Sequence, residues 1–147
     1  MIAHSITILL GLVIGQGLLV EELPTPVLWW EHGNPLCSQV RAVDASGMLW
    51  HDEGCENGRF TFEPLEQLSE EELESLTRFF ATLPTPPPAV SCSGGLAHRF
   101  VRRDEAAETY WTACGTSNVQ GEIDGLDRRF LEAARIFRGL EGANLEP

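Results

Sequence analysis

The sequence predicts an α+β domain in which two helices pack on one face of an antiparallel sheet of four to six strands. Three features indicate this fold class: two pairs of β-prone segments around polar turns, two segments with apolar residues at helical spacing, and four cysteines. A chain of 147 residues has room for one hydrophobic core. We therefore expect a single domain over residues 18–142, two disulfides, and a disordered tail at residues 143–147.

Residues 1–17 resemble a signal peptide. The run Ile6–Ile14 is apolar, and Gly15 and Gly17 are small residues at the two positions that signal peptidase recognises before its cleavage site. The first five residues carry no Lys or Arg, so an uncleaved anchor and a buried strand are the alternatives. A stretch that ends at Val20 is shorter than the roughly 20 residues that a membrane span needs. We predict an exported protein, secreted or periplasmic, without a stable membrane span unless this segment is retained.

Two hairpins are expected to build the sheet. Short β-prone segments precede and follow a turn-forming cluster at residues 44–47 and a polar break at residues 103–105. Leu28–Trp30 and Arg59–Phe62 can add strands to the first half.

The four cysteines support export, because disulfides persist in oxidising compartments. None lies in the Cys-x-x-Cys spacing of structural zinc sites. A hairpin folded about residue 46 brings Cys37 opposite Cys55, and one folded near residue 103 brings Cys92 opposite Cys114. These two pairings are our prediction. The alternative is four reduced cysteines in a cytosolic protein.

Two helices follow from capping and periodicity. Ser69 and Glu72 form a capping box, after which apolar residues recur on one face until Pro84. The second helix is expected from about Asp124 to about Gly142, and its polar face holds most of the C-terminal positive charge. Between them, residues 84–88 read Pro-Thr-Pro-Pro-Pro, which favours an extended polyproline connector.

The charge of the chain excludes some partners. The ten basic residues are all Arg, and 22 acidic residues give a formal net charge of −12. Nucleic acid and anionic membrane surfaces are therefore not expected as partners, because both require a basic protein surface.

No catalytic or metal-binding motif is present. His51, next to Asp52 and Glu53, could do acid–base chemistry if His32 and His98 came near it, but no His pair has the spacing of four that a helical zinc motif uses. We predict no cofactor, no metal and no catalytic residue. Trp29, Trp30, Trp50 and Trp111 are the candidate binding surface, for a protein or carbohydrate partner.

These features favour a small exported binding or inhibitory module without catalytic activity. A structural protein of the cell envelope is the first alternative. The second is a small hydrolase that uses His51 or His98 with nearby acids.

Overall fold

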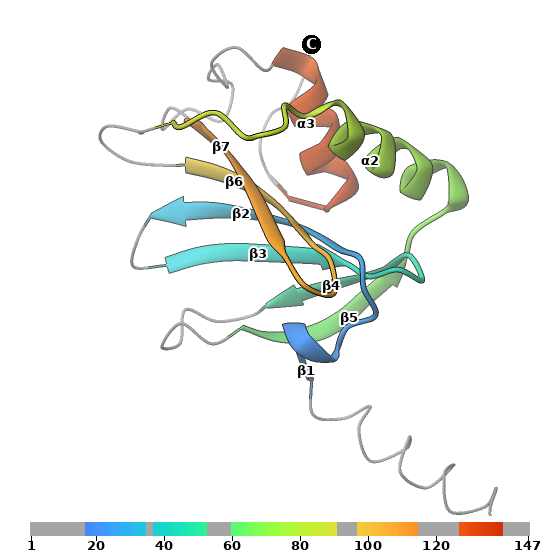
Figure 1. The fold of residues 1–147 in the computed structure, drawn as a ribbon. Coiled ribbons are helices and arrows are strands. Elements are labelled where there is room, and N and C mark those ends of the chain that lie inside the picture. The colour runs from blue at the N-terminus through green and yellow to red at the C-terminus, as the bar shows by residue number, and fades with distance from the viewer. Residues whose placement is uncertain (1–16, 35–36, 53–59, 91–96, 115–126, 140–147) are drawn as a thin grey trace, which may run out of the picture.

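In a computed structural model of the chain, residues 17–34, 37–52, 60–90, 97–114 and 127–139 are described. Seven strands form one sheet, and two α-helices lie together on one side of it (Figure 1). The elements are β1 (Leu18–Leu19), a 3-10 turn η1 (Val20–Glu22), β2 (Val27–Asn34), β3 (Cys37–Val43), β4 (Met48–Asp52), β5 (Thr61–Gln67), α2 (Glu70–Thr82), β6 (Ala97–Arg103), β7 (Glu108–Cys114) and α3 (Asp127–Ile136).

The predicted sheet of four to six strands built from two hairpins is wrong. The sheet has seven strands in the order β1-β5-β4-β3-β2-β6-β7, every pair is antiparallel, and the whole curls into a half-barrel. Strands β2 to β5 form one continuous meander, and the β6–β7 hairpin joins it on the free side of β2. The extra strand is β1, which directly follows the predicted signal peptide and in which Leu18 pairs with Phe62.

The turn between β3 and β4 forms where the sequence predicted it. Gly47 has a φ of +83°, a conformation that glycine adopts without steric cost. The Asp44 carboxylate accepts hydrogen bonds from the Ser46 N–H at 2.8 Å, the Ser46 hydroxyl at 2.6 Å and the Met48 N–H at 3.2 Å. Its second oxygen accepts from the Trp50 indole at 2.9 Å. Asp44 therefore fixes both the turn and the first residues of β4.

The turn between β6 and β7 lies further along the chain than the sequence predicted. The Asp104 N–H donates to the Ala107 carbonyl at 2.9 Å, so the turn spans residues 104–107 instead of centring near residue 103. In the resulting register Cys114 lies opposite Ala97. The polar break identified in the sequence contributes its last two residues to this turn, while Arg103 remains in β6.

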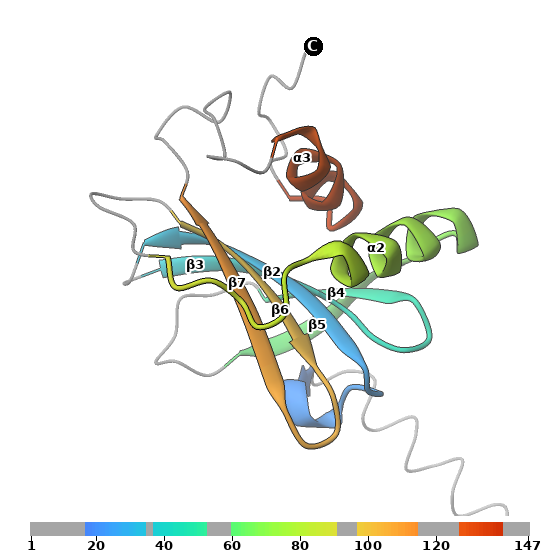
Figure 2. The ribbon, with the colours of Figure 1, turned by 45° about the horizontal axis from the view of Figure 1, so that its top comes forward.

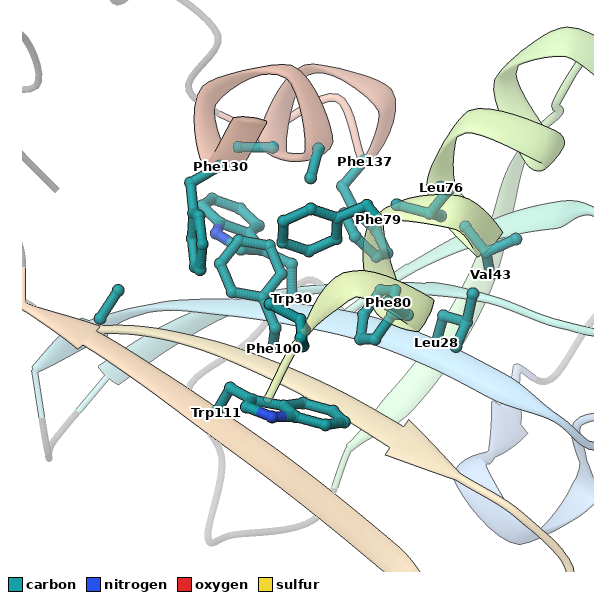
Figure 3. Packing of buried hydrophobic residues seen from close by; sticks show 14 of the residues in the cluster. Leu28, Trp30, Val43, Leu76, Phe79, Phe80, Phe100, Trp111, Phe130 and Phe137 are labelled. Carbon is teal, nitrogen blue, oxygen red and sulfur yellow. The ribbon is translucent and has the colours of Figure 1, made fainter. Parts of the chain in front are cut away.

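Both faces of the sheet carry a hydrophobic core. On the helix side, rings from the sheet meet rings from α2 and α3 edge to face, as in Phe100 against Phe130 at 4.8 Å between centroids (Figure 3). On the opposite face, Val27, Trp29 and Phe62 pack with residues of neighbouring strands. Burial on both faces explains the curl, because a flat sheet with one layer of helices would leave the second face in water.

The two helices pack beside each other over the sheet (Figure 2). At the start of α2, the Ser69 hydroxyl accepts from the Glu72 N–H at 3.1 Å and the Glu72 carboxylate accepts from the Ser69 N–H at 3.0 Å, which confirms the capping box. Arg138, just after α3 with a φ of +56°, donates to Glu72 and Glu66 and so connects this helix end to α2 and β5.

Candidate functional site

The four tryptophans do not form a shared exposed surface. Neighbouring side chains of a strand point to opposite faces, and each face of β2 is covered, so Trp29 enters one core and Trp30 the other. Trp111 is buried on the helix side, where its indole N–H donates to the Pro84 carbonyl at 2.7 Å. Trp50 is half-buried and bonded to Asp44. Three of these rings are buried and Trp50 is half-buried, and their role as a binding surface stays a prediction.

Two of the three histidines singled out from the sequence come together. His32 on β2 lies directly opposite His98 on β6, and their rings stack with centroids 4.4 Å apart. The Trp30 ring stacks on His32 at 5.6 Å, because residues two apart on a strand share a face. His98 is buried, with 6% of its surface exposed.

The hydrogen bond from Trp30 determines the state of His98. The Trp30 indole N–H donates to Nδ1 of His98 at 3.2 Å, and an indole can only donate. Nδ1 is therefore an acceptor, and the proton of the neutral ring is on Nε2. Burial, together with repulsion from His32, lowers the pKa of His98 to about 4, and burial also lowers the pKa of His32. Both rings are neutral at neutral pH.

His51 is remote from this pair. It lies on β4 opposite Arg41 of β3, and Arg41 in turn lies opposite Trp30 of β2. Strands β3 and β2 thus separate His51 from His98, a distance of about 14 Å at the usual strand spacing. Among the described residues, no group of three or more His, Cys, Asp or Glu side chains is placed to hold a metal ion.

The cysteine predictions concern residues that are largely outside the described part of the chain. Cys55 and Cys92 lie outside it, while the backbones of Cys37 and Cys114 begin β3 and end β7. In the first hairpin the described register ends with Val40 opposite Asp52. In the second hairpin Cys114 lies opposite Ala97, five residues after Cys92. The pairings Cys37–Cys55 and Cys92–Cys114 therefore stay predictions.

A concave feature of the described surface is a groove between α2 and α3, with a volume of about 420 Å³. Phe79, Ala133 and Ile136 supply apolar atoms to it, and both helices supply arginines. We call this feature the helix groove; it is lined by Ser75, Arg78, Phe79, Thr82, Arg129, Glu132, Ala133, Arg135 and Ile136.

Sequence reasoning did not find the helix groove. The signal available was the positive charge on the polar face of the second helix, together with Arg78 on the first. The packing of the two helices over the sheet decides which of their faces meet. The sequence pattern therefore indicated the arginines but not that they line a groove.

Comparison with known proteins adds no assignment. No protein-family model matches this chain, and no curated protein matches it. In the part of the chain that the structure describes, none of the helices combines the length and the apolar character needed to cross a membrane.

Proposed function

We propose that this chain is a small exported binding module that holds a segment of a partner protein in the helix groove. The observation that carries the proposal is the combination of an apolar floor with arginines from both helices. Protein-binding surfaces commonly join a desolvated apolar centre to a polar rim, and Arg is enriched among the residues that dominate binding energy. An inhibitor would use the same surface to occupy a partner's site.

The chemistry of the histidines supports binding over hydrolysis. A general base needs a free lone pair near the substrate and a pKa close to the working pH. The Nδ1 lone pair of His98 accepts the Trp30 N–H, and the pKa of His98 is about 4. His51 is two strands from His32 and three from His98, so the histidines do not converge on one substrate atom.

The binding proposal is tested by filling the groove. Short peptides are selected against the full chain from a displayed random library, and their affinities are measured by isothermal titration calorimetry. Ser75 lines the groove on an exposed part of α2, so Ser75→Trp should reduce affinity at least about tenfold by occupying the site. Thr77 is exposed on α2 outside the groove, and Thr77→Trp serves as the matched control.

Equal affinity of the selected peptides for both variants would contradict the helix groove as the binding surface. Failure to select any peptide would count against a peptide-binding module as a whole.

Export is tested separately, by intact mass of the protein from its native host before and after reduction and alkylation. We expect a chain that lacks residues 1–17 and takes up alkylating agent only after reduction. A full-length chain with four reactive thiols would contradict both export and the disulfides Cys37–Cys55 and Cys92–Cys114.

A further inference from the structure

We infer that the helix groove selects an acidic amphipathic segment, which places apolar side chains on the groove floor and carboxylates beside the arginines. This inference rests on the proposed function and adds the chemical class of the occupant.

The floor is apolar and held rigidly. Phe79 is packed edge to face against Phe100 and Phe130, each at 5.1 Å between centroids, and 9% of its surface remains exposed. Ala133 contributes a small side chain from α3, which leaves space above it between the helices. A floor fixed by the core loses little freedom on binding, and so favours an apolar anchor on the partner.

Three of the four charged side chains that line the groove are basic. Arg78 on α2 and Arg129 and Arg135 on α3 line the groove, while Glu132 is the single acid among its lining residues. Arg78 also contacts Glu74 at 2.8 Å, but both side chains are largely exposed, so water screens this pair. A guanidinium group can hold a carboxylate through two parallel hydrogen bonds and has five donors to share among partners.

The rest of the molecule increases the selectivity of this position. The chain carries a net charge of −12, so an acidic segment is repelled by most of the surface. A local excess of arginine then distinguishes the groove from its surroundings, because at physiological salt charges interact mainly within about 8 Å. A basic segment would be attracted to the molecule in general but repelled at the groove.

The test uses three labelled synthetic peptides that share one pattern of leucines at helical spacing. The remaining positions carry Glu in the first peptide, Gln in the second and Lys in the third, and fluorescence anisotropy reports binding to the full chain. We expect the Glu peptide to bind most tightly and the Lys peptide most weakly in the groove. Loss of two exposed arginine–carboxylate pairs in Arg129→Gln/Arg135→Gln should weaken the Glu peptide about 2- to 30-fold.

A second double variant controls for net charge. Arg102 and Arg103 lie on β6 outside the groove, and Arg102→Gln/Arg103→Gln removes the same two positive charges. It should leave the affinity for the Glu peptide within about twofold of the original.

The outcomes separate the inference from the proposed function. If the Gln peptide binds as tightly as the Glu peptide and Ser75→Trp blocks both, the groove binds peptides but the acidic preference is refuted. Equal weakening by the two double variants would also refute it, because only general charge would then matter. If none of the three peptides binds at millimolar concentration, or Ser75→Trp affects none, both the inference and the proposed function are overturned.

Discussion

Acidification should destabilise the fold through His98 before most carboxylates titrate. The side chain is 6% exposed and its pKa is about 4, against about 6.5 for a histidine in the unfolded chain. Between these values the unfolded state binds more protons than the folded state, so stability falls as the pH falls. From about pH 7 to about pH 5 the difference amounts to about 2 kcal/mol, and His32 shifts in the same direction.

The assay is urea denaturation followed by tryptophan fluorescence at the two pH values. In His98→Asn, the amide oxygen can take the place of Nδ1 as acceptor for Trp30, while the titrating ring is gone. This variant should lose much less stability on acidification than the original protein. The reasoning is refuted if the original protein is equally stable at both pH values, or if His98→Asn shows the same fall.

Three further predictions concern packing and polar contacts. Gly139→Ala should destabilise the fold by about 1–3 kcal/mol, because the added Cβ would clash with the Trp30 ring. Asp44→Ala should cost about 1–3 kcal/mol, because the part-buried N–H and O–H donors of the turn lose this buried carboxylate as their acceptor. The pKa of Glu72 is lowered by its hydrogen bond with the Ser69 backbone and by Arg138. Arg138→Met should therefore raise this pKa and should reduce stability by about 1 kcal/mol.

Urea denaturation measures the stability of all three variants, and a carboxyl-carbon NMR titration follows Glu72. Unchanged stability of the Gly139 variant would mean that the Trp30 ring can move aside. An Asp44 variant as stable as the original would mean that water replaces the carboxylate in the turn. No change in the pKa of Glu72 would show that Arg138 contributes little at this position and that the Ser69 backbone accounts for the shift.

Features that depend on neighbours in sequence could be predicted. The turn at residues 44–47 follows from Asp44 and Gly47, and the start of α2 follows from Ser69 and Glu72, because each signal acts within four residues. Features that depend on distant partners could not. Leu18 pairs with Phe62, and Trp29 is buried because the sheet curls, and neither outcome is encoded in the local pattern.

The candidate site follows the same division. The histidines and the arginines were visible as residue types, but pairing of His32 with His98 requires β2 to meet β6 across more than sixty residues. Helix periodicity gave an apolar and a polar side for each helix. The helix groove lies where the apolar side of each helix meets its polar side. The contact between α2 and α3 decides which of these side chains remain exposed.

The position of β2 between β3 and β6 has a consequence for the order in which the sheet can assemble. Its partner β3 follows it closely in the sequence, whereas its other edge pairs with β6, which is synthesised only after α2. Trp30 then gains His98 and, from residues after α3, Gly139. Its indole emission should therefore report the last stage of assembly, and a chain that ends before β6 should expose a long apolar strand edge that invites aggregation.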